Sequence, residues 1–508
     1  MDFESILYAD IHTEVLSAPP AFFQDLQLEY LLGIIERDAK GYNIRPHFYT
    51  FPGSEKMIRY RQEIFQDLSD RKLYDDLEDF CLQMQRSRDS YSLSLQCEEE
   101  IQRASYYLEA ASIYWKSILF LSESLNSAKL ASEGMRSLQN FLNKEITEKR
   151  NGGFEQGIRR ACEFFSQIRF RLNIEEDRIT IAEETIEPDN YLENLAKVTG
   201  KDVIQTDMVI TGIFPNRLEP SCLEMTLVNL LWKSNPGIFH EIKSFYHNYP
   251  EFYAKPILRF EEEIPVYLSF LKFREKTENL GFALRLPQLS SRNEFQGSGL
   301  YDLALVWKNA NRDYRVVSNE FSYPEHSSFF VVTGPNQGGK TTFARSMGQA
   351  VYFSMMGMYA NAEELTIPFF RDIATHFEVE EQLQSNSGKL KEEINRLAPM
   401  MKGTITNQFV ILNELFTTAT THDALIMGKE VMKHFLGKEC YGIYVTHIQE
   451  LAEETEQIIS LAAQIREEEE QRRTYRILPM KAKGYGYSES LVKEFELRYE
   501  DIKRRLSR

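Results

Sequence analysis

Long hydrophobic runs are missing from this sequence, and cysteine is scarce. The longest apolar runs, such as Ile118 to Leu121, are far shorter than the roughly 20 residues that a helix needs to span a membrane. The N-terminal residues MDFESILYAD lack the basic and apolar parts of a secretory signal. The five cysteines occur singly, without a C-x-x-C pair, which is typical of reduced thiols. We therefore expect a cytoplasmic protein with no membrane partner.

Basic charge is also in short supply. The 508 residues include 59 Lys and Arg against 76 Asp and Glu, which gives a net charge of -17. This balance argues against a protein that binds nucleic acid over its whole surface, but it leaves room for a local basic groove or for a clamp around DNA. The hydrophobic content of 43% is ordinary for a globular protein, and the length indicates two to four domains at roughly 150 residues each.

The first 290 residues have mainly helical patterns. Residues 1–75 mix short helical signals with turns, and residues 76–290 are interpreted as a helical domain. Apolar residues from Ile101 to Leu125 recur at intervals of three and four, and we interpret this stripe as packing within the chain rather than as a dimerising coiled coil. A turn-rich stretch, Leu286 to Gly299, is the expected boundary to a C-terminal domain over residues 291–508.

Beyond about residue 300 the pattern changes to strands that alternate with helices. Apolar, strand-like segments at 329–332, 409–412 and 442–445 are separated by segments with helical spacing. Such alternation predicts an α/β fold with a parallel sheet. The expected fold class is therefore a multidomain α+β protein, in which an all-helical region precedes an α/β domain.

The strand-like residues 329–332 lead into the stretch TGPNQGGKTT, which contains the P-loop pattern G-x-x-x-x-G-K-S/T. Glycines allow backbone N–H groups to turn towards phosphate oxygens, and the N-terminus of the following helix adds partial positive charge. Lys340 is expected to reach the β- and γ-phosphates, and the Thr341 hydroxyl to bind Mg²⁺. The residues expected to bind the nucleotide are Gly334, Pro335, Asn336, Gln337, Gly338, Gly339, Lys340, Thr341 and Thr342. The alternative is a glycine-rich turn without a ligand.

A second apolar strand, 409–412, ends in Asn413 and Glu414. An apolar strand followed by acidic residues is the layout of a Walker B segment, in which the first acidic residue supports Mg²⁺ and the next polarises the attacking water. Here the first position holds Asn413, an amide that can orient a water bound to Mg²⁺ but adds no negative charge. Glu414 is the candidate general base. The alternative is an Asn-Glu pair that caps the next helix.

Two further residues are candidates because of their positions. His447 follows the strand 441–445, at the edge where ligands bind in open α/β sheets, and there it can contact the γ-phosphate and the water. The alternative for His447 is a structural histidine. Ser387 precedes a helix over 390–401 and has the position of an N-cap. In ATP-sandwich dimers a serine at such a helix N-terminus closes over the γ-phosphate of the partner.

Together these residues resemble the DNA mismatch repair MutS family, whose ATPase is related to ABC transporters. TGPNQGGKTT is similar to the family's TGPN-x-x-GKST loop, and Thr446 to Leu451 is similar to its TH-x-x-EL segment. The resemblance implies an ABC-type P-loop ATPase domain at 291–508 and a helical core and lever domain at 76–290, whose start is at 1–75. It also implies that Ser387 is the trans-acting signature serine and that Asp423 is the D-loop aspartate.

The sequence also departs from the family. The family's segment D-E-x-G-R-G-T-S/T is here NELFTTATT, from Asn413 to Thr421, without the aspartate and the glycines. Slow hydrolysis is therefore expected. The chain begins almost at the helical core, so we also expect it to lack the domain that reads mismatches.

The resemblance implies a homodimer that sandwiches ATP and Mg²⁺ between its ATPase domains and closes around DNA. The DNA would be duplex or branched and recognised by its shape, in repair or recombination. The alternative is a nucleotide-switched protein-interaction module that does not bind DNA, and the acidic balance favours it. A third interpretation is an ABC-type ATPase of a membrane complex. The TGPN and TH-x-x-EL segments argue against it.

Overall fold

The computed structural model describes residues 3–8, 15–167, 170–175, 178–183, 236–312, 315–377, 388–402, 406–438, 440–465, 473–480 and 503. Contacts divide the chain into two compact units: the first is Met1–Glu4, Asp70–Leu130 and Met135–Glu261, and the second is Ser5–Ser69, Ala131–Gly134 and Glu262–Arg508. Residues 5–69 thus belong to the unit that holds the α/β fold, while functional domain limits at 75 and 290 stay a prediction. Among the described residues, no helix has both the length and the apolar composition to cross a membrane.

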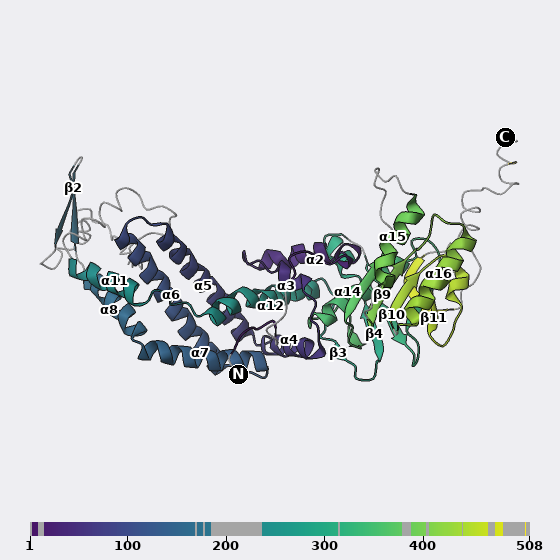
Figure 1. Ribbon diagram of the computed structural model, residues 1–508, viewed down its shortest axis with the longest axis horizontal. Coiled ribbons are helices and arrows are strands. Elements are labelled where there is room, and N and C mark those ends of the chain that lie inside the picture. The colour runs from purple at the N-terminus through teal and green to yellow at the C-terminus, as the bar shows by residue number, and fades with distance from the viewer. Residues whose placement is uncertain are drawn as a thin grey trace, which may run out of the picture. The chain divides into compact units, whose positions relative to one another are not determined.

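The first unit consists mainly of helices (Figure 1). Its elements are α5 (Arg71–Gln96), α6 (Glu100–Ser127), most of α7 (Glu133–Asn151), α8 (Phe154–Gln167), the antiparallel strands β1 (Phe170–Glu175) and β2 (Arg178–Glu183), α11 (Pro236–Asn248) and the first part of α12 (Lys255–Asn279). Helices α5 and α6 lie side by side, and the predicted stripe from Ile101 to Leu125 is buried. The interpretation of that stripe as packing within the chain is therefore confirmed. The apolar segments at 209–214 and 223–232, and residues 488–508 apart from Lys503, lie outside the described residues.

A six-stranded sheet forms the centre of the second unit. Its strands are β6 (Phe329–Thr333), β8 (Asp372–His376), β9 (Gln408–Asn413), β10 (Tyr441–Val445), β11 (Ile458–Ile465) and β12 (Arg473–Pro479). They lie in the order β12-β11-β6-β10-β9-β8, and all neighbours are parallel except β11 and β12. The predicted parallel α/β sheet is thus present. Because the strands run the same way, β6, β9 and β10 bring their carboxyl ends to one edge of the sheet.

The second unit also contains a four-stranded sheet that the sequence analysis missed. Its order is β3-β7-β4-β5, with β3 (Gln288–Leu289), β4 (Phe295–Leu300), β5 (Asn319–Tyr323) and β7 (Glu364–Ile367). The turn-rich interpretation of 286–299 was wrong, because β3 and most of β4 lie there. A Cβ on Gly297 would lie 2.8 Å from the Phe321 ring of the neighbouring strand, so this glycine allows close strand packing rather than a turn.

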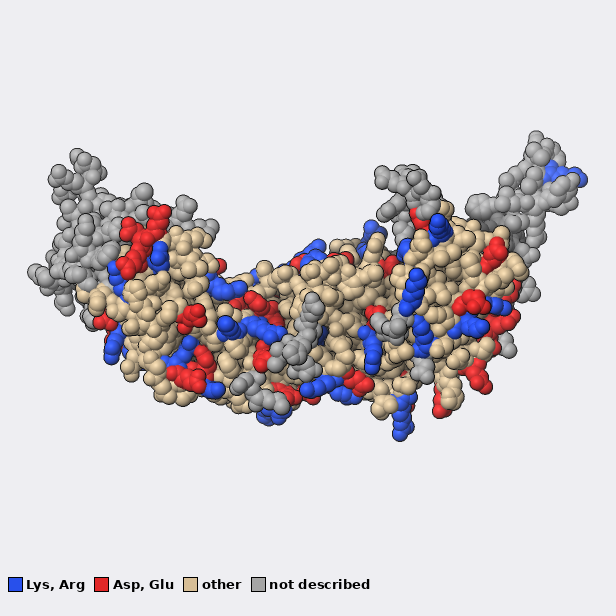
Figure 2. All heavy atoms as spheres, in the orientation of Figure 1, with Lys and Arg blue, Asp and Glu red and all other residues tan. Residues whose placement is uncertain are grey.

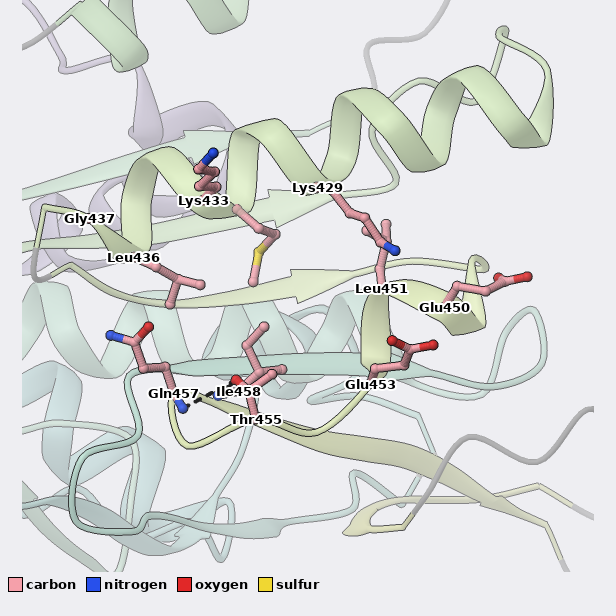
Figure 3. Close-up of a pocket in the computed structure, with 11 residues that line it drawn as sticks. Lys429, Lys433, Leu436, Gly437, Glu450, Leu451, Glu453, Thr455, Gln457 and Ile458 are labelled. Carbon is pink, nitrogen blue, oxygen red and sulfur yellow. Dashed lines mark hydrogen bonds between the residues drawn. The ribbon is translucent and has the colours of Figure 1, made fainter.

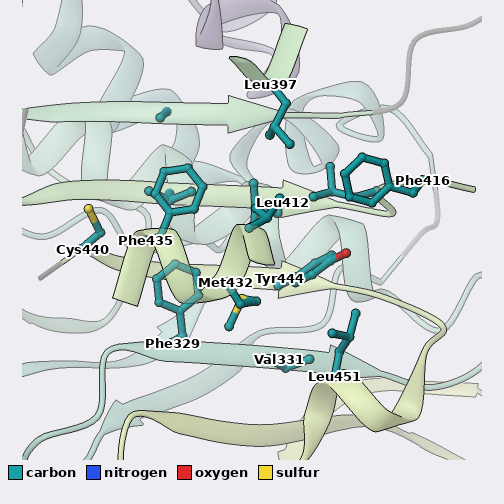
Figure 4. Packing of buried hydrophobic residues seen from close by; sticks show 14 of the residues in the cluster. Phe329, Val331, Leu397, Leu412, Phe416, Met432, Phe435, Cys440, Tyr444 and Leu451 are labelled. Carbon is teal, nitrogen blue, oxygen red and sulfur yellow. The ribbon is translucent and has the colours of Figure 1, made fainter. Parts of the chain in front are cut away.

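Helices cover the six-stranded sheet and pack around it (Figure 1). They are α14 (Lys340–Met355), α15 (Lys389–Lys402), α16 (Thr421–Leu436) and the short 3-10 helix η2 (Gln449–Ala452), with α13 (Leu303–Lys308) near β4. One core cluster joins β6, β9 and β10 to α16 and η2, and includes Phe329, Leu412, Tyr444 and Phe435 (Figure 4). This packing fixes the strand ends from which the predicted site residues project.

The N-terminal part of the second unit packs on the P-loop helix. Its elements are α1 (Phe22–Asp25), α2 (Leu28–Ile35), the short 3-10 helix η1 (Glu36–Asp38), α3 (Arg45–Tyr49) and α4 (Glu55–Asp67). The side chain of Ser54 caps α4 by accepting the N–H of Met57. Gln349 of α14 donates to the carbonyl of Leu26 at 3.0 Å. A Cβ on Gly348 would clash with the Leu26 side chain, so this glycine allows α14 to pack closely against Leu26.

Candidate nucleotide-binding site

The loop between β6 and α14 has a backbone suited to phosphate. Gly334 and Gly339 take positive φ values of 124° and 94°. The N–H of Gly338 donates to the carbonyl of Pro335 at 3.2 Å and closes a turn inside the loop. A Cβ on Gly338 would lie 2.9 Å from the Ala463 side chain and 3.0 Å from the Pro335 carbonyl oxygen. The glycines therefore serve the conformation and the close approach that the loop needs.

Lys340 begins α14, and its side chain turns back into the loop. Its ammonium donates to the carbonyl oxygens of Gly334 and Pro335, each at 3.1 Å. Lys340 is 4% exposed, and burial lowers the pKa of its ammonium, while the carboxylate of Glu414 acts in the opposite direction. A phosphate in the loop would give this cation a charged acceptor in place of two neutral carbonyls.

The two residues predicted to support Mg²⁺ are in contact. The Thr341 hydroxyl donates to Oδ1 of Asn413 at 2.9 Å. Asn413 is the last residue of β9, lies opposite Val445 of β10 and is buried. Both side chains offer neutral oxygens, which Mg²⁺ accepts alongside phosphate oxygens and water. The oxygen set therefore fits a Mg²⁺ ion that arrives with a nucleotide.

Glu414 and His447 form a pair at the same edge of the sheet. Oε1 of Glu414 lies 3.0 Å from Nε2 of His447, and the backbone N–H of Glu414 donates to the carbonyl of Val445 at 2.8 Å. The hydrogen bond with His447 lowers the pKa of the Glu414 carboxyl, burial opposes this, and the charge on Lys340 adds to the lowering. A carboxylate with a lowered pKa is ionised at neutral pH, and only that form can accept a proton from water.

The turn after β9 is strained. Glu414 and Phe416 have positive φ values of 54° and 60°, and this conformation costs about 1–3 kcal/mol for each residue with a side chain. Phe416 stands where the MutS-type segment D-E-x-G has glycine. Its side chain is 2% exposed and belongs to the core cluster with Leu415 and Leu412 (Figure 4). Core packing therefore holds a conformation that glycine would adopt without strain.

A pocket of about 360 Å³ lies beside these residues. Six predicted residues line it, namely Gln337, Gly339, Lys340, Thr341, Thr342 and Glu414. It is also lined by residues that no sequence pattern marked, among them Arg315, Val316, Val317, Asn319 and Tyr475. Val316 is buried and Tyr475 is 39% exposed, so this side of the pocket offers apolar and aromatic surface beside the polar residues Arg315 and Asn319. Such a wall suits the flat face of a nucleobase.

Asn319 connects the two sheets at this wall. Its Oδ1 accepts the N–H of Ile477 at 2.8 Å, and its amide nitrogen donates to the carbonyl of Tyr475 at 3.4 Å. Tyr475 has a positive φ of 58°. Asn319 in β5 therefore sets the backbone of β12 next to the pocket. The contact joins residues 156 positions apart, so no local sequence pattern could predict it.

The structure does not bring Ser387 and Asp423 together with the other predicted site residues. Ser387 lies outside the described residues. Asp423 is exposed in the first turn of α16, where its carboxylate accepts the Thr420 hydroxyl at 2.7 Å and its N–H donates to the same hydroxyl at 3.2 Å. These are the contacts of a helix cap. The roles assigned to Ser387 and Asp423 remain predictions.

A second pocket, of about 500 Å³, lies between α16 and the segment that follows His447 (Figure 3). Its lining combines apolar side chains such as Leu436 and Leu451 with the charged residues Lys429, Lys433 and Glu450. The carboxyl edge of β6, β9 and β10, by contrast, gathers the cation, the hydroxyl, the amide and the carboxylate that nucleotide chemistry needs. That edge is therefore the candidate site.

The part of the chain that contains this carboxyl edge of the sheet is similar to known proteins. Residues 330–489 match MutS domain V. The chain is 28% identical over 137 residues to the DNA mismatch repair protein MSH4 of Arabidopsis thaliana, which covers 27% of this chain and 17% of that protein. It is also 28% identical over 167 residues to the DNA mismatch repair protein MutS of Syntrophomonas wolfei, which covers 32% of this chain and 19% of that protein.

A MutS of Thermotoga maritima gives a similar result. It is 26% identical over 137 residues, which covers 27% of this chain and 17% of that protein. The chain therefore matches less than a fifth of the length of each of these three relatives. The candidate residues Lys340, Thr341, Asn413, Glu414 and His447 all lie inside the stretch that matches MutS domain V.

Proposed function

We propose that this chain, whose residues 330–489 match MutS domain V, is a MutS-like ATPase. In this proposal the protein binds ATP with Mg²⁺, hydrolyses ATP slowly, and uses binding and hydrolysis to clamp DNA as a homodimer. The observation that carries the proposal is that Lys340, Thr341 and Glu414 line one pocket, while Asn413 is hydrogen-bonded to Thr341 and His447 to Glu414.

Each of these residues has a role that follows from its chemistry. Lys340 and the N–H groups of the loop hold the phosphates. Thr341 and Asn413 hold the Mg²⁺, which neutralises charge on the phosphate oxygens when it is bound. Glu414 accepts a proton from the attacking water, and His447 orients its carboxylate through the 3.0 Å hydrogen bond.

Slow hydrolysis follows from Asn413. An aspartate at this position would add a negative charge next to the Thr341 hydroxyl, whereas the amide of Asn413 adds none. The protein then holds Mg²⁺ with fewer charged ligands, and the ATP-bound state lasts longer. A long-lived ATP state suits a clamp better than a rapid motor.

The proposed homodimer would share each nucleotide site between its two protomers. Ser387 and Asp423 would act across a homodimer interface, on the nucleotide of the partner. The relatives reported above are named DNA mismatch repair proteins, which favours duplex or branched DNA as the partner. On the face drawn in Figure 2, basic and acidic side chains are interspersed, so recognition would rest on the shape of the DNA rather than on a uniformly basic surface.

The test is DNA binding by the full chain with and without ATP and Mg²⁺, at stated salt concentrations, on duplex, branched and single-stranded DNA. We expect the affinity for at least one duplex or branched DNA to change when ATP is added. Lys340→Ala is the control that should remove this change. If ATP alters the oligomeric state but leaves the affinity for every DNA unchanged, the protein is a nucleotide-switched protein-interaction module instead.

A further inference from the structure

Helix α15 contacts the turn that carries the candidate general base. Oε1 of Glu393, in the second turn of α15, accepts the backbone N–H of Phe416 at 2.6 Å. Phe416 lies two residues after Glu414, within the same left-handed turn. This hydrogen bond joins a carboxylate to a main-chain donor, a combination that is stronger than a hydrogen bond between neutral groups.

The turn depends on a small number of anchors. The N–H of Glu414 donates to the carbonyl of Val445, the side chain of Phe416 is packed in the core, and the N–H of Phe416 donates to Glu393. Removing the last acceptor would leave the N–H of a buried residue without its carboxylate partner. The turn could then relax its two left-handed residues, and Glu414 would move with it.

We propose that Glu393 is a positioning residue for ATP hydrolysis, which holds the Glu414 carboxylate in its catalytic pose through the N–H of Phe416. The proposal rests on the proposed ATPase function. Glu393 does not belong to the described residues that line the nucleotide pocket, so its effect is on the chemical step and not on nucleotide binding. The hydrogen bond requires an acceptor at the length of a glutamate side chain and does not require the negative charge itself.

The test is steady-state ATP hydrolysis by full-length variants at position 393, with nucleotide affinity measured separately by a fluorescent ATP analogue. Glu393→Gln keeps the length and an acceptor oxygen, and its kcat should stay within about threefold of the parent. Glu393→Asp keeps the charge but is one methylene shorter, so it should lose kcat by about 10- to 100-fold with KM and nucleotide affinity little changed. Glu393→Ala should match Glu393→Asp.

Two controls separate this inference from its alternatives. Asn395→Ala removes an exposed side chain of the same helix and should leave kcat unchanged. Because Glu393→Gln and Glu393→Asp are both conservative, their comparison remains informative if Glu393→Ala does not fold. Equal kcat for the Asp and Gln variants, or a change in KM alone, overturns the positioning role. A parent protein without ATPase activity overturns the proposed function instead.

Discussion

Two loops at the same edge of the sheet reach left-handed backbone conformations by different means. In the P-loop, two of the three positive φ values fall on Gly334 and Gly339, which adopt them without strain, and the third is the φ of 60° at Gln337. In the turn after β9 they fall on Glu414 and Phe416, at a cost of about 1–3 kcal/mol each. The P-loop conformation is therefore encoded mostly by its glycines, whereas the conformation of the β9 turn depends on core packing and on the carbonyl of Val445.

The difference between the two loops matches their two proposed tasks, phosphate binding by the P-loop and placement of the Glu414 carboxylate by the β9 turn. The P-loop must present N–H groups to phosphate whether or not its surroundings change, so local encoding suits it. The turn with Glu414 must place one carboxylate beside His447, and it does so through contacts that other elements can adjust. We therefore expect substitutions in the P-loop to affect nucleotide binding and substitutions around the β9 turn to affect hydrolysis.

The largest expected effect is on the P-loop side. Lys340→Ala removes the buried cation that would hold the phosphates, and ATP affinity should fall at least about 100-fold, which is about 3 kcal/mol. Isothermal titration with ATP and Mg²⁺ measures this. Lys308→Ala removes a lysine of α13, whose ammonium bonds to Gln27, and should leave the affinity unchanged. An unchanged affinity for Lys340→Ala would remove the P-loop from the nucleotide site.

On the side of the β9 turn, Glu414→Gln should leave ATP affinity intact and lower kcat by roughly 100- to 1,000-fold, because the amide cannot accept a proton. The closed, ATP-bound dimer should then accumulate. Single-turnover hydrolysis and light scattering of the ATP-bound protein measure the two effects. Hydrolysis by Glu414→Gln at the parent rate would show that another group is the base.

The pair formed by Glu414 and His447 predicts a pH dependence. The His447 hydrogen bond lowers the pKa of the Glu414 carboxyl, so the ionised base persists to lower pH and kcat falls only as the pH passes that lowered pKa. His447→Ala removes the cause and should move the acid limb of the kcat profile to higher pH. His447→Gln retains a donor and should move it less. Identical acid limbs in all three proteins would separate Glu414 from His447.

The sequence predicted those parts of the site that depend on short, local residue patterns. The strands β6 and β9 are present close to their expected limits, α14 follows the P-loop as expected, and Thr341 contacts Asn413. Contacts between distant residues were not predicted. Gln349 bonds to Leu26 across 323 positions and Asn319 to Tyr475 across 156, and neither residue type signals its partner. Gly297 was misread as part of a turn, because a glycine that permits close packing looks the same in sequence as one that bends the chain.

A smaller effect should distinguish the two kinds of left-handed residue directly. Phe416→Ala and Phe416→Gly both remove the buried ring, but only glycine relieves the strain at a φ of 60°. The glycine variant should therefore be the more stable of the two, by about 1 kcal/mol, the reverse of the usual order inside regular structure. Urea midpoints of the same unfolding transition compare them. An alanine variant as stable as the glycine variant would mean that the turn relaxes once the ring is gone.

The smallest expected effect concerns the charge at the end of β9. Asn413→Asp keeps an oxygen within reach of the Thr341 hydroxyl and adds a negative charge at the expected Mg²⁺ position. The Mg²⁺ concentration for half-maximal hydrolysis should fall by about two- to fivefold, or turnover should rise by a similar factor, since a charged oxygen binds the ion more strongly than an amide. Hydrolysis measured across a Mg²⁺ titration tests this, with Asn413→Ala as the control that lacks the oxygen. If Asn413→Asp behaves as the parent, the amide is a replacement to which the rest of the site is tuned, and the slow-hydrolysis argument loses its basis.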